Sequence, residues 1–164
     1  MKEQDLITYC GSYGGSCARW QGYSQFRELV SLLNEWVDTQ GYQHWMPRET
    51  RDFDYNEFKK GLEFFSKKDS WLVCNRCCKG GDGNPDCEIR KCCVELELEI
   101  CFDCLDFPCE KVSENSELIE RARQYKTLGR DEWLRKQIEK ANQGFENHTK
   151  KYYQLNVSED VPNA

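Results

Sequence analysis

Cysteine is the residue type in this sequence with the clearest capacity for chemistry. It accounts for 11 of the 164 residues, and most of the cysteines fall close together. Residues 74–93 read CNRCCKGGDGNPDCEIRKCC, and CFDCLDFPC follows at 101–109. Thiols at this density are typical of metal sites, disulfide frameworks or redox centres. Because eleven is an odd number, disulfides alone cannot pair every thiol.

Two C-x2-C pairs have the most informative spacing. Cys74 with Cys77, and Cys101 with Cys104, each bring two sulfurs within reach of one ion through a single tight turn. Two such pairs complete the tetrahedral four-thiolate shell of a zinc ribbon. The spacing therefore predicts that these four cysteines share one metal.

The remaining candidate ligands are spaced more loosely. A second four-thiolate site is expected from Cys10, Cys17, Cys109 and either Cys87 or Cys92. A Cys₃His site that uses His44 is the alternative, but both His44 and His148 lie outside the cluster and neither is expected to bind metal. Two zinc ions are thus predicted, and nine residues are their candidate ligands: Cys10, Cys17, Cys74, Cys77, Cys87, Cys92, Cys101, Cys104 and Cys109.

Zinc is favoured over an iron–sulfur cluster, although thiolate shells suit both. The compact C-x2-C-x2-C run of ferredoxins is absent from the sequence, and a zinc ion would order a segment with few large apolar residues. Neighbouring residues rarely bind one ion together, which leaves Cys78 and Cys93 as extra thiols. They are interpreted either as small buried hydrophobic residues or as reactive thiols, whose pKa nearby Arg and Lys side chains would lower.

Four longer helices are predicted to position the cysteine cluster of residues 74–109. Two precede it, over 24–38 and 54–67, with Ser24 and Asp54 as caps, and two follow it, over 116–127 and 131–150. Gly144 is a candidate break in the last one. The first helix is expected to bury one face, formed by Phe26, Leu29, Val30, Leu33, Trp36 and Val37.

The cluster itself is expected to contain little regular structure. The run GGDGNP at 80–85 predicts a turn. A short helix over 88–96 is favoured over a strand, although VELELEI at 94–100 alternates as a strand would. The predicted fold class is therefore mainly α, with α+β as the alternative, in a single domain over 1–155 that includes the CGSYGGSC segment. Residues 156–164 are predicted to form a flexible tail.

Composition excludes several classes of function. A net charge of −6 and a pI near 5.1 disfavour nucleic acid and anionic membranes as partners. No apolar run approaches the roughly 20 residues that span a bilayer, and the N-terminus lacks the apolar region of a secretory signal. A cytoplasmic location is therefore expected. In a reducing cytoplasm clustered thiols are metal ligands or redox groups more often than disulfides.

Four segments in this order resemble a known protein family: YCGSYGGSCARW (9–20), CNRCC (74–78), CEIRKCC (87–93) and CFDCLDFPCEKV (101–112). The family is the one called domain of unknown function 3795, and the ending FPCEK is its most specific mark. The resemblance extends to the helix LGRDEWLRKQIEKA (128–141). It implies a zinc-binding protein without an established activity, and places the nine candidate ligands on the family's cysteine positions. One difference is that Gly14 stands where the family often has a cysteine.

These observations favour a non-enzymatic module in which structural zinc holds a surface that meets another protein. The alternative is a redox or metal-handling protein that uses Cys78 and Cys93 or a thiolate-bound cluster. A hydrolytic zinc enzyme is less favoured, because catalytic zinc keeps an open position and the chain has no recognisable catalytic motif. A nucleic-acid-binding ribbon would depend on a few basic residues alone, namely Arg76, Lys79, Arg90 and Lys91.

Overall fold

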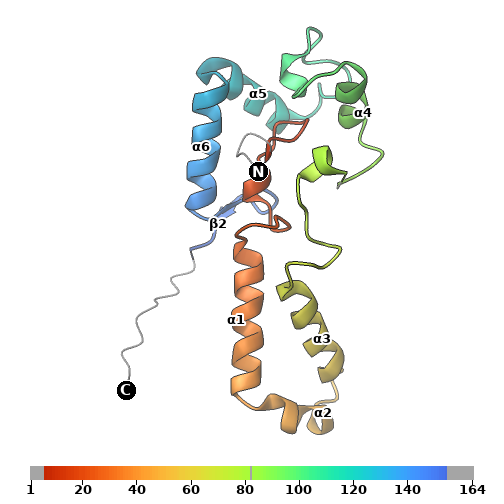
Figure 1. Ribbon diagram of the computed structural model, residues 1–164, viewed down its shortest axis with the longest axis vertical. Helices are drawn as coiled ribbons and strands as arrows, with labels where there is room; N and C mark the ends of the chain where they lie inside the picture. Colours follow the sequence, from red (N-terminus) through yellow and green to blue (C-terminus); the bar gives the residue numbers. More distant parts are fainter. Residues whose placement is uncertain (1–5, 82, 155–164) are drawn as a thin grey trace.

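The computed structural model describes residues 6–81 and 83–154 and is mainly helical, which confirms the predicted fold class (Figure 1). The predicted tail over 156–164 lies outside the described residues. The α-helices are α1 (Gln25–Thr39), α2 (Met46–Glu49), α3 (Tyr55–Ser66), α4 (Glu88–Glu95), α5 (Ser116–Leu128) and α6 (Arg130–Asn142). Short 3-10 helices are η2 (Gly14–Ser16), η3 (Tyr42–His44), η4 (Cys77–Gly80) and η5 (Cys101–Asp103), and β1 (Phe145–Glu146) pairs with β2 (Lys151–Tyr152) in an antiparallel hairpin.

The main core lies where α5, α6 and the N-terminal segment meet the cysteine-rich loops. Trp133 and Phe102 are completely buried at its centre, and the ring of Tyr125 packs against both. The rest of this core is Leu6, Ile7, Tyr13, Cys93, Ile100, Cys101, Val112, Leu118, Ala122 and Leu134. The backbone of Tyr9 accepts a hydrogen bond of 2.8 Å from the Cys101 N–H, so the N-terminal segment folds back onto the cysteine-rich region.

Helices α1 and α3 form a separate hairpin that projects away from α4, α5 and α6 (Figure 1). Its own small core consists of Val37, Tyr55 and Leu62. The ammonium group of Lys59 ties the two helices together, with its Nζ 2.6 Å from the side chain of Asn34 and 2.7 Å from that of Asp38. The hairpin is therefore held by few buried groups.

The buried face predicted for the first helix is wrong. Of its six apolar residues only Val37 is buried, and four are more than a third exposed: Phe26, Leu29, Leu33 and Trp36. The period of the pattern was identified correctly, but the hairpin offers α1 a single neighbouring helix. One helix covers only a narrow strip of another, so most of a wide apolar stripe stays in solvent.

The helix caps follow the sequence in part. The Asp54 carboxylate accepts hydrogen bonds from the N–H groups of Asn56 and Glu57, at 2.8 and 3.0 Å, as its position predicted. Ser24 is the N-cap residue of α1, but its hydroxyl donates to the Ala18 carbonyl at 2.7 Å and caps nothing. The expected capping bond is thus replaced by one that fixes the preceding loop.

Two further expectations concern the helix within the cysteine-rich segment and the last helix of the chain. The short helix favoured over 88–96 is present as α4, and the alternative strand over 94–100 is not formed. The helix predicted over 131–150 ends at Asn142, so its second half is wrong. Gly144 has a φ of +86°, which breaks the helix and leads into the hairpin of β1 and β2.

Within the described residues, no helix is long and apolar enough to cross a membrane.

Candidate metal centre

The cysteines line two cavities, and the two C-x2-C pairs fall in different ones. Cys74 and Cys77 line a cavity of about 500 Å³. Cys101 and Cys104 line a much smaller cavity of about 20 Å³. The structure therefore does not bring the two pairs together in the manner of a zinc ribbon. Each pair instead has other cysteines beside it.

Cys17 lines the larger cavity together with Cys74 and Cys77, and these three thiols are called the first group. The backbone of Cys74 is fixed to the segment after Cys17, because its N–H donates to the Arg19 carbonyl at 2.7 Å and its carbonyl accepts from the Gln21 N–H at 3.0 Å. The Cys77 N–H donates to the Cys74 sulfur at 2.8 Å, and Cys77 adopts a φ of +53° to close this tight turn. Burial raises the pKa of the Cys77 thiol, and the nearby thiols of Cys74 and Cys17 raise it further.

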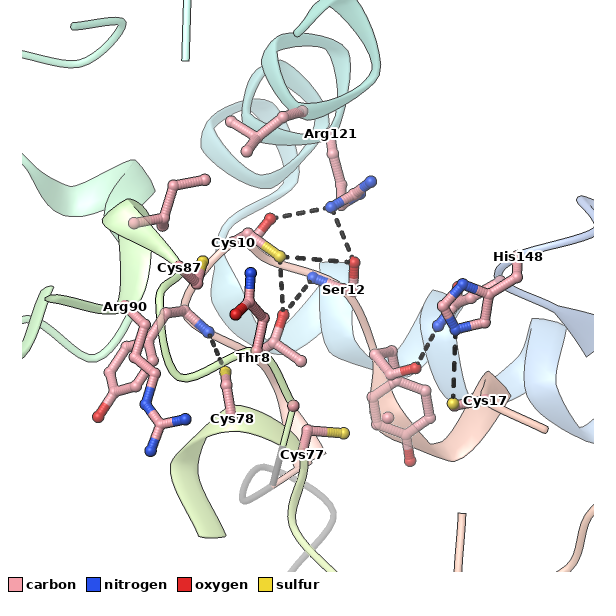
Figure 2. A pocket seen from close by; sticks show the side chains of 18 of the residues that line it. Thr8, Cys10, Ser12, Cys17, Cys77, Cys78, Cys87, Arg90, Arg121 and His148 are labelled. Carbon is pink, nitrogen blue, oxygen red and sulfur yellow. Dashed lines mark hydrogen bonds between the residues drawn. The ribbon is translucent and has the colours of Figure 1, made fainter. Parts of the chain in front are cut away.

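His148 contacts Cys17 from the far end of the chain. Its Nε2 lies 3.6 Å from the Cys17 sulfur, and both residues line the larger cavity (Figure 2). A sulfur and a nitrogen bound to one tetrahedral zinc ion, at about 2.3 and 2.0–2.1 Å, are about 3.6 Å apart. The Cys17–His148 spacing thus equals that of two ligands on one zinc ion. His148, which the sequence analysis placed outside the site, thus lies beside one of the candidate ligands.

A buried carboxylate holds the turn that carries His148. Glu146 is 7 % exposed and accepts backbone hydrogen bonds from Thr149 at 2.7 Å, His148 at 3.0 Å and Ala18 at 3.4 Å. Burial alone would raise the pKa of Glu146, but these backbone donors outweigh it and the pKa is lowered. Since Ala18 follows Cys17 directly, one ionised side chain positions both members of the Cys17–His148 pair.

Gly14 lies directly against the first group of thiols. A Cβ atom at this position would stand 2.5 Å from the Cys77 sulfur and 3.1 Å from the Leu6 carbonyl oxygen. Any side chain larger than hydrogen would therefore displace the sulfur. This is the position at which the resembled family often has a cysteine, so here the sulfur of Cys77 occupies space that such a side chain would need.

The second group surrounds the smaller cavity. Five cysteines line it, together with apolar residues such as Ile89, Leu98 and Phe107: Cys92, Cys93, Cys101, Cys104 and Cys109. A volume of about 20 Å³ holds one water-sized particle, which is also the size of a metal ion. Burial and the surrounding thiols raise the pKa of both Cys93 and Cys101 to about 12. Cys93, interpreted from the sequence as an extra thiol, is thus buried among the other cysteines of this group.

Cys10, Cys78 and Cys87 line the larger cavity beside the first group. Burial would raise the pKa of Cys10, but hydrogen bonds to Thr8 and Ser12 and the charge of Arg121 outweigh it, and the pKa is lowered. The sulfur of Cys10 lies 3.3 Å from Thr8 Oγ1 and 3.8 Å from Ser12 Oγ (Figure 2). Burial raises the pKa of Cys78, whose sulfur accepts a 3.5 Å hydrogen bond from the Tyr9 N–H.

Some of the basic residues near the cysteines form ion pairs with carboxylates. Lys79 pairs with Glu99 at 2.8 Å and sits over the ring of Tyr9, and Lys91 lies 3.3 Å from Glu88. Arg90 lines the larger cavity. Their charge therefore lies close to the thiols, but carboxylates already offset part of it.

Across the part of the chain that the structure describes, no three His, Cys, Asp or Glu side chains already stand together as a metal-binding group. The donors meet in pairs, Cys17 with His148 and Cys74 with Cys77. Both pairs line the same cavity. The chemistry of this donor set, three sulfurs and one imidazole nitrogen, fits zinc.

Comparison with known proteins adds a family to this geometry. The family model described as protein of unknown function (DUF3795) matches residues 6–114. The chain belongs to this family. All eleven cysteines lie inside the matched DUF3795 region, whereas His148 lies beyond it. No curated protein and no solved structure matches the chain.

The sequence pattern gave no local sign of His148. It stands in the run ENHTK, without a second ligand nearby, and 131 residues separate it from Cys17. Gly144 was an indirect signal, because a helix break at this glycine indicates that the residues after it, including His148, form a turn rather than a helix. The pairing of that turn with Cys17 depends on the tertiary fold.

Proposed function

We propose that this DUF3795 protein binds zinc through its cysteines and uses the metal to hold its loop-rich body together. The first site would consist of Cys17, Cys74, Cys77 and His148. The second would use four of the five thiols around the smaller cavity. The observation that carries the proposal is the 3.6 Å separation between the Cys17 sulfur and His148 Nε2.

A structural role follows from the number of donors. Four protein ligands close a zinc shell and leave no position for water or substrate, whereas catalytic zinc keeps one position open. When bound, zinc would supply folding free energy on the order of 10 kcal/mol per site. The chain's own residues prepare for this role, since Glu146 fixes the His148 turn and the Cys74 backbone is bonded to the segment after Cys17.

The test is metal analysis of natively purified protein, with an absorption spectrum recorded without oxygen. We expect about two zinc ions per chain and no visible absorption, and we expect a chelator to lower the unfolding midpoint. A visible chromophore with stoichiometric iron would assign the thiolates to an iron–sulfur cluster instead. Metal-free protein whose stability a chelator leaves unchanged would refute both.

The two histidines provide a matched pair of variants. His148→Gln should weaken zinc binding at the first site, because it removes one of four donors. His44→Gln removes the other histidine, which is exposed and whose Nε2 lies 3.4 Å from the Gln43 amide nitrogen, so zinc affinity should not change. Equal affinities for the two variants would remove His148 from the site.

A second candidate function is thiol redox chemistry or metal handling. The observation that favours it is the environment of Cys10. Its lowered pKa makes it a better nucleophile than Cys78 or Cys93, whose pKa values are raised. Alkylation of the metal-loaded protein with iodoacetamide, followed by mass mapping, tests this. We expect modification at Cys10 before Cys93, and equal slow labelling at both would contradict it.

A further inference from the structure

The hairpin of α1 and α3 carries a wide apolar face in solvent. On α1 the exposed residues are Phe26, Leu29, Leu33 and Trp36, with 39, 43, 42 and 67 % of each exposed. Their spacing of three, four and three residues places them along one stripe of the helix. On α3 and just before it, Phe53, Phe58 and Phe65 are 46, 37 and 40 % exposed.

These two sets form one continuous face. The rings of Phe26 and Phe65 meet edge to face with centroids 5.6 Å apart, so the α1 stripe and the α3 aromatics lie on the same side of the hairpin. The ring of Phe53 extends the face by packing on Phe58 at 5.7 Å. The acidic residues Glu28 and Glu35 lie outside the α1 stripe. Keeping an apolar face of this composition in water costs free energy that a covering partner would recover.

The hairpin also lacks the internal core that a unit of its size needs. Its buried apolar side chains are Val37, Tyr55 and Leu62, and its two longer helices contain 15 and 12 residues. Units of about 40 residues usually require a metal, a disulfide or association for stability. The cysteines all lie outside this segment, between positions 10–17 and 74–109. Association is therefore the means available to the hairpin.

The order of residues in the α1 stripe fits a second copy of the same chain. Read in either direction, the stripe is aromatic, leucine, leucine, aromatic, and its midpoint falls at residue 31. An antiparallel pair of α1 helices about a two-fold axis would set Phe26 against Trp36 of the second copy, and Leu29 against Leu33. Such self-complementarity is what an isologous contact requires.

The area agrees with the size of a small stable interface. Five of these seven residues are aromatic, and aromatic side chains present about 150–250 Å² each. With the two leucines taken as similar in size, the exposed fractions of the seven amount to at most about 600 Å² per copy. Two copies would then bury up to about 1,200 Å², which is the lower end of the range for specific protein pairs. We propose that the protein is a homodimer in which two hairpins pack face to face as a four-helix bundle. This proposal is independent of the metal.

Sedimentation equilibrium of the full-length protein tests the proposal. We expect the unsubstituted chain to be a dimer at tens of micromolar, since interfaces of this size commonly reach micromolar affinity. Leu33→Glu should weaken dimerisation at least about 100-fold, because the two-fold axis brings two glutamates into the apolar contact. Leu96→Glu is the matched control: Leu96 is 52 % exposed at the end of α4, away from the hairpin, and its substitution should leave the dimer intact.

A second measurement guards against misfolding of the Leu33→Glu chain. In a mixture of isotope-labelled and unlabelled native protein, filtered NMR spectra should show contacts between the Leu29 and Leu33 methyl groups of different copies. Zinc content should be equal in all variants, so loss of the dimer is distinct from loss of the metal. A native chain that stays monomeric at 200 micromolar, on the order of the concentrations used in such spectra, would overturn the proposal, as would equal effects of Leu33→Glu and Leu96→Glu. A monomer that binds a hydrophobic dye through this face would assign it to a different partner.

Discussion

Gly14→Ala is the substitution that tests the first metal site most directly, because it adds one methyl group beside one proposed ligand. Gly14 has no positive φ, so alanine can adopt its backbone conformation without strain. The added Cβ would stand 2.5 Å from the Cys77 sulfur. The effect of the substitution therefore comes mainly from this contact, and to a lesser degree from a longer one of 3.1 Å to the Leu6 carbonyl.

The size of the displacement follows from ordinary contact distances. Nonbonded heavy atoms approach to about 3.5–4.0 Å, so the Cys77 sulfur would have to move by about 1 Å. Metal sites require their ligands to stay within about 0.5 Å of the productive position. We expect zinc affinity to fall about 10–100-fold, as for substitutions that misplace a ligand. Overpacking should also lower the stability of the metal-free protein by about 1–3 kcal/mol.

Zinc affinity is measured by competition with a chromophoric chelator, and stability by urea unfolding after metal removal. Gly61→Ala is the control, since a Cβ at Gly61 meets nothing within 4 Å in the middle of α3. It should leave zinc affinity unchanged and raise stability by up to about 1 kcal/mol. If Gly14→Ala binds zinc within about twofold of the unsubstituted protein, a shift of its sulfur carries no cost and Cys77 is not a ligand.

Three further predictions concern stability and pH. Gly11→Ala should destabilise the protein by at least about 2 kcal/mol in urea unfolding, because Gly11 has a φ of +73° and a Cβ there would overlap the buried ring of Phe102. Glu146→Gln should cost about 2 kcal/mol at pH 7. The folded pKa of Glu146 is lowered, so its contribution to stability is present above its ordinary pKa and is lost as the pH falls through the folded value. The difference in stability between the two proteins should therefore shrink as the solution is acidified below the ordinary pKa of a glutamate. Zinc affinity should rise with pH by about tenfold per unit for each bound thiol. Thiols such as Cys93 and Cys101, with pKa values of about 12, are protonated at neutral pH and must release a proton to bind zinc. Calorimetry in buffers of different ionisation enthalpy measures both the affinity and the number of protons released.

Local patterns predicted where the four longer helices lie, although not every end of them. Asp54 marks the start of α3 and Gly129 the end of α5, as predicted, because a few neighbouring residues decide where a helix is capped or broken. The spacing of Leu118, Ala122 and Tyr125 identified the buried face of α5, since that helix packs on a complete core. The same reasoning failed for α1. Periodicity predicts which residues share a face, but not whether a second element covers that face.

The grouping of the cysteines could not be read from the sequence. Spacing set Cys78 and Cys93 aside as extra thiols, yet both line the cavities together with the nine candidate ligands, whose role stays a prediction. It assigned the Cys74 and Cys101 pairs to one ion, and the structure places them in different cavities. The partner of a C-x2-C pair is chosen by the path of the chain. That path depends on contacts such as the bridge between Trp20 and Cys74, which no spacing rule contains.

The position of His148 gives the first site a mechanical consequence. A metal bound by Cys17, Cys74, Cys77 and His148 would close the chain into loops of up to 131 residues. A cross-link that closes a loop of about 100 residues removes about 4–5 kcal/mol of conformational entropy from the unfolded chain. Because the hairpin of α1 and α3 lies inside the loop between Cys17 and Cys74, the same ion would also fix the base of that hairpin. Zinc at the first site would thereby fix the point at which the hairpin joins the rest of the protein, while the affinity between two copies would come from the apolar face alone.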